Sequence, residues 1–226
     1  MFFVSESVVA IDFGNVINEE LNKKVIALSN YLSEHPLTGM IEVVPAYSSI
    51  SIYFDIVSIQ RIHHSRKVHQ WISNELDKLA CLQFADAPSN SKIIRIPVCY
   101  ETEYGTDLPW IAGQKNISTD EIIRLHTSVR YRVYMLGFLP GFAYMGEADE
   151  KIIVPRKLQP QTVQAGSVGI TGRQTGVYPL QSPGGWQIIG RTPLKMFDRD
   201  TDELCQVKAG DSVEFYSISK DEFENY

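Results

Sequence analysis

Three consecutive polar residues, Arg173, Gln174 and Thr175, stand between Gly172 and Gly176 and are the first candidates for chemistry in the sequence. A guanidinium is a planar fork of donors that suits a carboxylate or a phosphate, and a neighbouring amide and hydroxyl can orient the bound group. The flanking glycines let the backbone turn tightly or approach a ligand closely. The same pattern is typical of a tight hairpin whose polar tip faces solvent, so a binding site and a structural turn are both open.

An aromatic loop over residues 137–146 precedes this segment and combines glycines, a proline and three aromatic rings. Pro140 stiffens the loop, and Phe138, Phe142 and Tyr144 offer flat apolar surface against which a substrate can lie. Because most aromatic side chains of this kind belong to a core, a buried corner of a barrel is the alternative interpretation.

A third candidate segment reads Ser182-Pro183-Gly184-Gly185-Trp186 and predicts a rigid turn that places an indole ring. A core tryptophan that follows a turn explains the same pattern equally well. Ten of the 15 glycines fall within residues 137–190, so all three candidate segments lie where the backbone is most specialised.

His126 is the candidate general acid or base, because an imidazole titrates near neutral pH. It ends a helix that the capping-box spacing Ser118-Thr119-Asp120-Glu121 predicts, just before the strand that leads into the aromatic loop. A histidine satisfied within the core, or lying at the C-terminus of a helix, is the alternative. His63, His64 and His69 lack the spacing of a metal site and predict a solvated helix face, so we expect no metal.

Several classes of site are missing from the sequence. It contains no GxxxxGK[ST] phosphate loop, no G-x-G-x-x-G that opens a helix, no HExxH and no GxSxG. The net charge is −6 and the pI about 5.4, without the basic excess of a nucleic-acid-binding protein. Arg124, Arg130 and Arg132 come nearest to a basic cluster and predict a solvated face rather than a track for phosphates.

Cys81, Cys99 and Cys205 are odd in number and widely spaced, which argues against a disulfide framework and a structural zinc site. Residues 133–146 form an uncharged, largely apolar stretch of 14 residues, fewer than the roughly 18 to 20 that span a bilayer. The first residues lack the basic region of a signal peptide. We therefore expect a cytoplasmic protein without nucleic-acid or membrane partners.

The elements that must position these candidates divide the chain into two domains, 1–88 and 89–226. The first is predicted to run strand (2–13), helix (18–35, capped by Asn18), strands (41–44 and 49–55) and helix (68–79). This order predicts an α+β domain with its helices on one face of an antiparallel sheet. The Pro- and Ser-containing segment Ala87–Ser91 is the predicted boundary.

The second domain begins with a strand over residues 92–100 and contains two short helices, one capped by Asp107 and one by Ser118. Short strands separated by Gly and Pro turns then follow, at 130–138, 163–170, 177–180, 187–190, 194–197 and 212–218. Many short strands at close intervals predict a closed or nearly closed β-barrel.

The motifs, taken together, form a specific pattern. They are Gly137-Phe138-x-Pro140-Gly141-Phe142-x-Tyr144-x-Gly146, Pro155-Arg156, Ala165-Gly166-Ser167-Val168-x-Ile170-x-Gly172-Arg173-Gln174-Thr175-Gly176-x-Tyr178-Pro179, Ser182-Pro183-Gly184-Gly185-Trp186 and Gly190-Arg191-Thr192-Pro193. This pattern resembles the signature of the family formed by the B subunits of bacterial 5-oxoprolinase, also called allophanate hydrolase subunit 1, which includes the KipI-type sporulation kinase inhibitors. Gln164, Thr171 and Glu147 depart from the family pattern, but no polar residue of the signature is lost.

The resemblance implies an α+β N-terminal domain followed by a cyclophilin-like β-barrel domain. It also implies a subunit of an ATP-dependent 5-oxoprolinase that works with partner subunits A and C and converts 5-oxoproline, ATP and water to glutamate, ADP and phosphate. Because the sequence has no phosphate loop, we expect ATP to be held by an unusual site or by a partner, and the isolated chain to be inactive. A KipI-type inhibitor of a sporulation histidine kinase and a subunit for an allophanate or urea-type amide are the alternatives.

If the chain is a member of this family, Arg173 binds the substrate anion, Gln174 and Thr175 orient it and donate hydrogen bonds, and His126 transfers a proton. Phe142 and Trp186 form walls that exclude water. The expected substrate-binding set comprises Phe138, Pro140, Phe142, Tyr178, Ser182, Pro183, Gly184, Gly185, Trp186 and Arg191.

Overall fold

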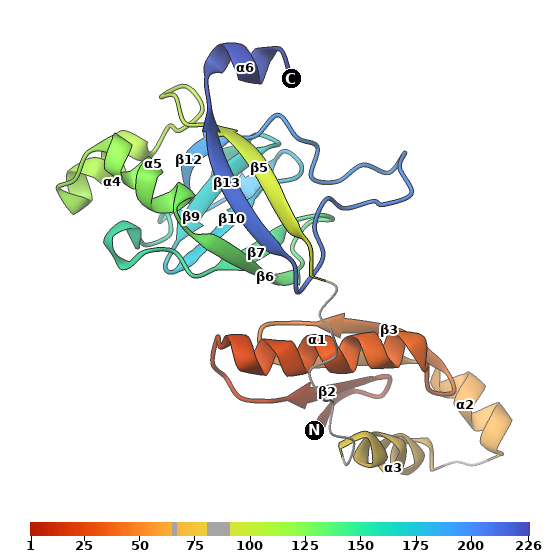
Figure 1. Cartoon of the computed structure of the whole chain (residues 1–226). Helices are drawn as coiled ribbons and strands as arrows, with labels where there is room; N and C mark the ends of the chain where they lie inside the picture. The colour runs from red at the N-terminus through yellow and green to blue at the C-terminus, as the bar shows by residue number, and fades with distance from the viewer. Residues whose placement is uncertain (65–66, 81–90) are drawn as a thin grey trace. The chain divides into compact units, whose positions relative to one another are not determined.

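A computed structural model of the chain describes residues 1–64, 67–80 and 91–226. The chain forms two compact units, Met1–Ser89 and Asn90–Tyr226 (Figure 1). The predicted boundary segment falls almost entirely outside the described residues, as does Cys81.

The N-terminal unit combines a four-stranded antiparallel sheet with three helices. Its elements are β1 (Phe2–Ser5), β2 (Val8–Asp12), α1 (Glu19–Glu34), β3 (Met40–Pro45), β4 (Ser49–Phe54), α2 (Ile56–His63) and α3 (Val68–Ala80), with the sheet order β1-β2-β4-β3. Ile50, Ile52 and Phe54 alternate along β4 and are buried on one face. They share one core with Val25 and Leu28 of α1 and with the apolar faces of α2 and α3.

The structure differs from the sequence expectation at two points in this unit. Residues 2–13 form two strands, β1 and β2, which pair antiparallel, with Phe2 opposite Ala10. Helix α2 is an additional element, and it begins at Asp55, whose carboxylate accepts a hydrogen bond from the Ser58 backbone N–H at 3.0 Å. The predicted cap of α1 is confirmed, since the Asn18 side chain accepts from the backbone N–H of Leu21.

The C-terminal unit is a closed barrel, as predicted, with the strand order β10-β7-β6-β13-β5-β12-β9 (Figure 1). Its strands are β5 (Ile93–Cys99), β6 (Arg130–Leu136), β7 (Ala143–Gly146), β9 (Ser167–Thr171), β10 (Gln174–Val177), β12 (Gln187–Arg191) and β13 (Ser212–Ile218). Strands β8 (Gln161–Val163) and β11 (Ser182–Gly184) form a separate pair. Neighbouring barrel strands run antiparallel except β13 and β5, which pair in parallel. The barrel interior is one continuous apolar core.

Helices α4 (Leu108–Lys115), α5 (Thr119–Thr127) and α6 (Lys220–Glu224) accompany the barrel, together with the short helix η1 (Glu150–Ile152). Ser118 caps α5 as predicted, but Asp107 makes no side-chain cap to α4. The Asp107 carboxylate instead accepts from the Ile188 N–H at 2.6 Å and pairs with Lys157 at 2.6 Å. Asp107 therefore occupies the cap position of α4 as predicted, but its carboxylate ties the start of the helix to β12 and does not bind the helix N–H groups.

Three further strand predictions are corrected by the barrel. The strand expected at 177–180 is instead β10, which ends at Val177. Residues 194–197 form no strand, only an isolated bridge between Phe197 and Cys205. The stretch 163–170 is split between β8 and β9 by a turn at Gly166, which has φ +83°. Gly166 also lies against the Thr192 carbonyl, which a methyl group at that position would approach to 2.4 Å.

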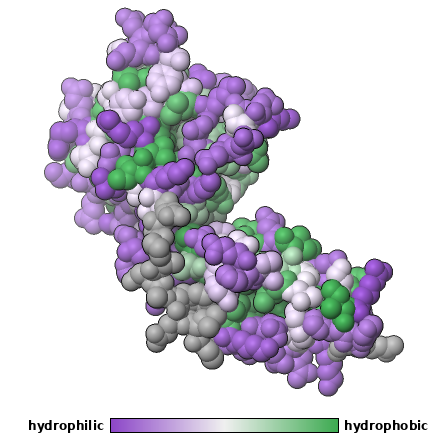
Figure 2. Space-filling model, turned by 45° about the vertical axis from the view of Figure 1, so that its right-hand side comes forward, coloured by the Kyte–Doolittle hydropathy of each residue, from purple (hydrophilic) through white to green (hydrophobic). Residues whose placement is uncertain are grey.

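Polar side chains cover most of the surface drawn in Figure 2, with small apolar areas between them. No helix in the described part of the chain is long and apolar enough to cross a membrane. Cys99 and Cys205 are free cysteines, and Cys99 is buried.

Candidate functional site

Strand β10 connects the sequence-predicted site residues but does not bring them together. Arg173 stands at the turn before β10, Thr175 lies within it, and Tyr178 follows its end. Tyr178 lies five residue steps beyond Arg173 along extended chain, about 16 Å at 3.3 Å per residue. The predicted residues thus fall into three places: a hairpin tip, the barrel core and an aromatic cluster.

At the hairpin tip, the Arg173 guanidinium is held by two glutamates. Its Nε donates to Glu147 at 2.9 Å, and its Nη1 donates to Glu150 at 2.9 Å. Gly172 supplies the turn, with φ +52°. The carboxylates raise the pKa of Arg173, chiefly through the hydrogen bond to Glu150. The tip therefore has the solvent-facing hairpin geometry of the structural alternative, and its cation is already paired.

Replacing Arg173 by alanine is expected to leave the midpoint of denaturant unfolding almost unchanged. The Arg173 side chain is 49% exposed and that of Glu150 is 79% exposed, and exposed pairs contribute little because water and salt screen them. Urea titration of the parent and variant proteins under identical conditions measures the two midpoints. A clear fall of the variant's midpoint would contradict this picture of an exposed pair.

In the barrel core, His126 bridges two hydroxyl groups. Its Nδ1 lies 2.8 Å from the Tyr100 hydroxyl, and its Nε2 lies 2.9 Å from Thr175 Oγ1. The Thr175 hydroxyl donates to the Gly169 carbonyl at 3.2 Å. It therefore accepts from Nε2–H, and this assignment of the tautomer leaves Nδ1 to accept from the Tyr100 O–H.

Burial controls the charge of this histidine. His126 is fully buried, and desolvation lowers its pKa from 6.5 to about 3. The ring is neutral at pH 7, and no carboxylate appears among the causes of the shift. His126 thus matches the core alternative, in which it joins α5 to Tyr100, just after β5, and to Thr175 of β10 through satisfied hydrogen bonds.

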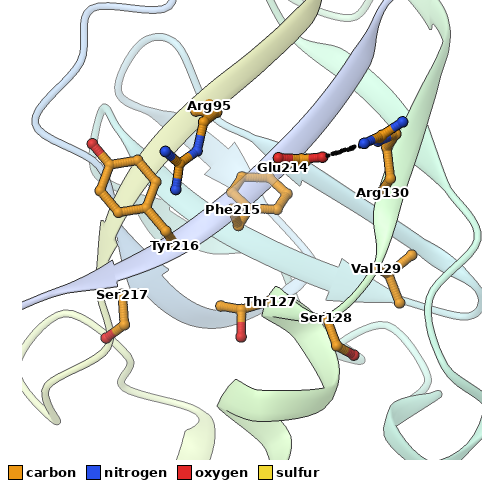
Figure 3. A pocket seen from close by; sticks show the side chains of 9 residues that line it. All are labelled: Arg95, Thr127, Ser128, Val129, Arg130, Glu214, Phe215, Tyr216 and Ser217. Carbon is orange, nitrogen blue, oxygen red and sulfur yellow. Dashed lines mark hydrogen bonds and ion pairs between the residues drawn. The ribbon is translucent and has the colours of Figure 1, made fainter.

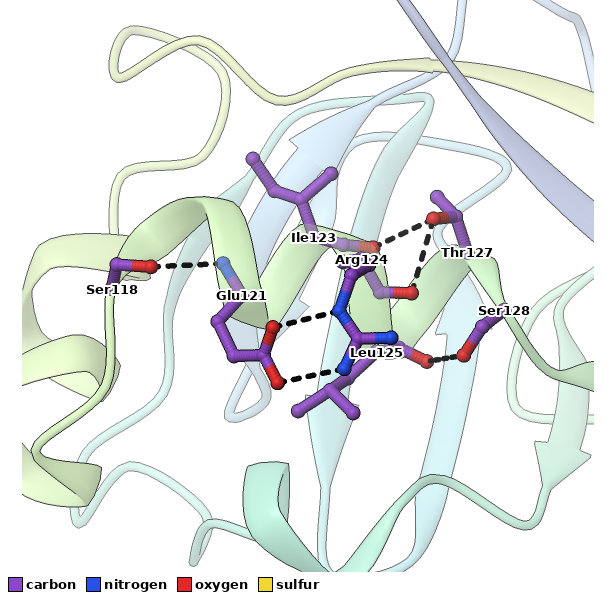
Figure 4. Close-up of polar contacts among 7 residues, drawn as sticks. All are labelled: Ser118, Glu121, Ile123, Arg124, Leu125, Thr127 and Ser128. Atoms are coloured by element: carbon purple, nitrogen blue, oxygen red, sulfur yellow. Dashed lines mark hydrogen bonds and ion pairs between the residues drawn. The ribbon is translucent and has the colours of Figure 1, made fainter.

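Helix α5 positions His126 and carries exposed polar contacts on its outer side (Figure 4). Ser118 accepts from the Glu121 N–H at 3.1 Å, and Glu121 binds the Arg124 guanidinium through both oxygens at 2.7 Å. Thr127 donates back to the Ile123 carbonyl at 2.8 Å. Arg124 therefore belongs to a solvated helix face, as the sequence predicted.

At the other end of β10, aromatic rings surround Phe142. Its ring meets those of Phe138, Tyr144, Tyr178 and Trp186 edge to face, with centroids 4.8 to 5.6 Å apart. Phe142, Tyr178 and Trp186 are buried and belong to one cluster that is separate from the barrel core. This aromatic cluster brings together the candidate residues of the aromatic loop, the end of β10 and the turn before β12.

The loop between β6 and β7 presents Phe138 to solvent. Phe138 has φ +69°, unusual for a residue with a side chain, and its ring is 60% exposed. Gly141 has φ +81° and packs against the Met196 carbonyl, which a methyl group there would approach to 3.0 Å. Such backbone conformations persist only where the surrounding structure holds them, and they occur often at binding sites.

The turn at Gly184 and Gly185 packs directly on this cluster. A methyl group at Gly184 would lie 2.6 Å from the Tyr178 hydroxyl, and one at Gly185 would lie 3.6 Å from Nε and Nη2 of Arg156. Ser182 is buried, and its hydroxyl has no hydrogen-bond partner among the described residues. Gly184 thus lets the Tyr178 phenol approach the backbone closely, and the Arg156 guanidinium lies at ordinary contact distance from Gly185.

The remaining predicted residues have other surroundings. Arg191 donates to the Ala165 carbonyl at 2.8 Å and lies 5.9 Å from the Phe223 ring, so its guanidinium serves the packing of α6 and the turn before β9. Pro140 and Pro183 are exposed, and Gln174 is half-buried on β10 opposite Gly146. Sequence reasoning assigned no role to Arg156, although it stands in the family motif, because nothing in the sequence shows that it meets the aromatic cluster.

Two open clefts of about 620 and 500 Å³ lie elsewhere on the barrel unit. In the first, Arg95 lies 4.9 Å from the Tyr216 ring and Arg130 pairs with Glu214 at 2.7 Å (Figure 3). None of the sequence-predicted site residues is among the residues that line either cleft. The aromatic cluster is therefore the candidate site that the sequence and the structure share.

Comparison with known proteins identifies what the chain resembles. The family model for the carboxyltransferase domain, subdomain C and D, matches residues 1–207. The B subunit of 5-oxoprolinase from Bacillus subtilis is 38% identical over 99% of this chain and 94% of its own length, and that from Escherichia coli O157:H7 is 34% identical over 95% and 94%. The crystal structure of TTHA0988 superimposes with a TM-score of 0.81 and 32% identity, covering 94% of this chain but only 40% of that longer one.

Proposed function

Because the chain belongs to the carboxyltransferase subdomain C and D family and is related to the B subunits of 5-oxoprolinase within it, we propose that it is one subunit of an ATP-dependent 5-oxoprolinase. The complete enzyme would open 5-oxoproline to glutamate with ATP and water, together with partner subunits A and C. The observation that carries this proposal is the similarity to subunits of that enzyme along almost the whole of both chains. The closed seven-stranded barrel supports the finer expectation of a cyclophilin-like fold for the second unit.

Opening a lactam is hard because the amide is stabilised by resonance and the leaving amine needs a proton. Phosphorylation of the amide oxygen would activate the carbon, and hydrogen-bond donors would then stabilise the charge that develops on the oxygen. In this chain Phe142 and Trp186 are buried, and they support the exposed Phe138 and half-buried Tyr144 rings, which can exclude water from one side of a small ring. His126 remains neutral at pH 7 inside the core, so we place the proton transfer on a group outside that network.

ATP does not fit the predicted anion site at the hairpin tip. The sequence has no phosphate loop, and Arg173, which was expected to bind an anion, is held between Glu147 and Glu150. A triphosphate beside these carboxylates would meet like charge. We therefore propose that a partner subunit binds ATP, and we derive no step through ATP on this chain.

Co-expression with candidate subunits A and C, followed by an assay of glutamate and phosphate formation, tests the function. We expect the three-subunit complex to release both products only when 5-oxoproline and ATP are present, and the purified chain alone to be inactive. Turnover by the isolated chain would overturn its role as an incomplete part of the enzyme. An inactive complete complex would overturn the 5-oxoprolinase proposal itself.

A second candidate function, inhibition of a histidine kinase, is supported by the exposed Phe138 ring, which could grip a helical bundle. Mixing the purified chain with a sporulation-type sensor kinase distinguishes the two functions. Suppression of kinase autophosphorylation, lost in Phe138→Ser, would favour the inhibitor. Unchanged autophosphorylation, with an active three-subunit complex, would favour the enzyme.

A further inference from the structure

Arg156 is fixed beside the aromatic cluster by hydrogen bonds on both of its neighbours. The Pro155 carbonyl accepts from Gln187 Nε2 at 3.1 Å, and the Lys157 N–H donates to the Gly185 carbonyl at 2.7 Å. Lys157 also pairs with Asp107 at 2.6 Å. The segment is thus bound to the turn before β12, and Arg156 is held at that turn although its own side chain is exposed.

The guanidinium of Arg156 lies at the turn of Gly184 and Gly185, where a methyl group at Gly185 would be 3.6 Å from its Nε and Nη2 and one at Gly184 would be 2.6 Å from the Tyr178 hydroxyl. Its charge lowers the pKa of Tyr144 and Tyr178, against the larger effect of burial, which raises both. Within residues 1–64, 67–80 and 91–226, no carboxylate forms an ion pair with Arg156. The contrast with Arg173 is direct, because that guanidinium already binds two glutamates.

The surroundings of Arg156 suit both the carboxylate and the apolar ring of a cyclic amino-acid derivative. Phe138, which is 60% exposed, and the half-buried Tyr144 contact the buried Phe142 ring and form the accessible apolar side of the cluster, which suits a five-membered ring. Ser182, a residue that is 8% exposed, lies on the strand that enters the same turn, and its buried hydroxyl has no hydrogen-bond partner in the described chain. An unsatisfied buried hydroxyl is costly, and a ligand or a water can satisfy it.

We propose that Arg156, with the hydroxyls of Tyr144 and Tyr178, binds the carboxylate of a small cyclic amide whose ring lies against the aromatic cluster. This inference rests on the proposed function and moves the anion-binding role from Arg173 to Arg156. A guanidinium forms two parallel hydrogen bonds with a carboxylate, which fixes the orientation of the ring as well as its position. Arg156 is thereby a specificity residue that selects lactams with a carboxylate.

The test measures kcat and KM for 5-oxoproline in the complete complex with wild-type, Arg156→Ala and Arg156→Lys chains. Loss of a hydrogen-bonded charge corresponds to a rise in KM of roughly 10-fold or more. We expect this rise in Arg156→Ala with a smaller change in kcat, and partial recovery in Arg156→Lys, which keeps the charge but not the fork. Arg124→Ala is the matched control, because Arg124 is exposed on α5 and binds only Glu121 among the side-chain contacts drawn in Figure 4.

The outcomes separate this inference from the function on which it rests. A wild-type complex that does not hydrolyse 5-oxoproline counts against the proposed function. An active wild-type complex whose KM changes less than about 2-fold in Arg156→Ala overturns the carboxylate site. A fall in kcat with an unchanged KM in Arg156→Ala also overturns the carboxylate site, as does an equal rise in KM in Arg124→Ala. Neither result is expected from the loss of a substrate contact.

Discussion

Replacing Gly190 by alanine is expected to lower the free energy of unfolding of the barrel by about 3 kcal/mol, at the upper end of the usual cost of overpacking. The added methyl group would lie 2.6 Å from Val98 Cγ1 and 2.8 Å from the Cys99 carbonyl oxygen. Gly190 lies where β12 pairs with β5 and closes the barrel. In this strand pair Arg191 lies opposite Cys99. Since the obstacle includes backbone, a side-chain rotation cannot relieve it.

Two other glycines separate the causes of this effect. A methyl group at Gly113 in α4 would meet nothing within 4 Å, so Gly113→Ala should stabilise the chain by about 0.5 to 1 kcal/mol through helix propensity. Gly172 also has open space but φ +52°, and Gly172→Ala should cost about 1 kcal/mol from backbone strain. Denaturant titration of the three variants measures the order of their free energies of unfolding. A Gly190→Ala protein as stable as Gly113→Ala would contradict the prediction, because it would show that β5 and β12 can move apart to make room for the methyl group.

The sequence predicted the parts of the fold that depend on local chemistry. Asn18 and Ser118 cap their helices as expected because a side-chain oxygen three residues before a free N–H is a local arrangement. The closed barrel followed from short strands and Gly turns. Asp107 shows where this reasoning fails, because its carboxylate accepts a hydrogen bond from the backbone N–H of Ile188, 81 residues away.

The candidate site was harder to predict because its contacts also depend on residues far apart in the sequence. Arg173, Thr175 and Tyr178 are neighbours in sequence, but the alternation and length of β10 place them at a solvent tip, in the core and in the aromatic cluster. Arg156 is distant in sequence from the cluster that it meets. Residue type indicated which groups could do chemistry, whereas their partners depend on strand register.

Acidification from pH 6.5 to pH 5 is expected to lower the stability of the barrel by about 2 kcal/mol through His126. Its pKa falls from 6.5 to about 3 on folding, so below pH 6.5 the unfolded chain binds a proton that the native core excludes. Stability is therefore full above pH 6.5 and declines as the pH falls toward 3, by about 1.4 kcal/mol per pH unit. Carboxylates with lowered pKa, such as Asp198, titrate below this window.

Tryptophan fluorescence can measure this dependence in the barrel alone. In a Trp71→Phe background the remaining tryptophans, Trp110 and Trp186, both belong to the barrel unit, so denaturant titrations at pH 6.5 and 5 report its unfolding. The loss should disappear in His126→Gln, which cannot be protonated, and persist in His35→Gln, which alters a histidine of the other unit. Equal barrel stability at the two pH values in the parent protein would mean that the His126 pocket admits water or a proton, and that the core hydrogen bonds to Tyr100 and Thr175 do not hold the ring neutral. The prediction thereby tests the one histidine that sequence reasoning offered as an acid or base, independently of any assay of turnover.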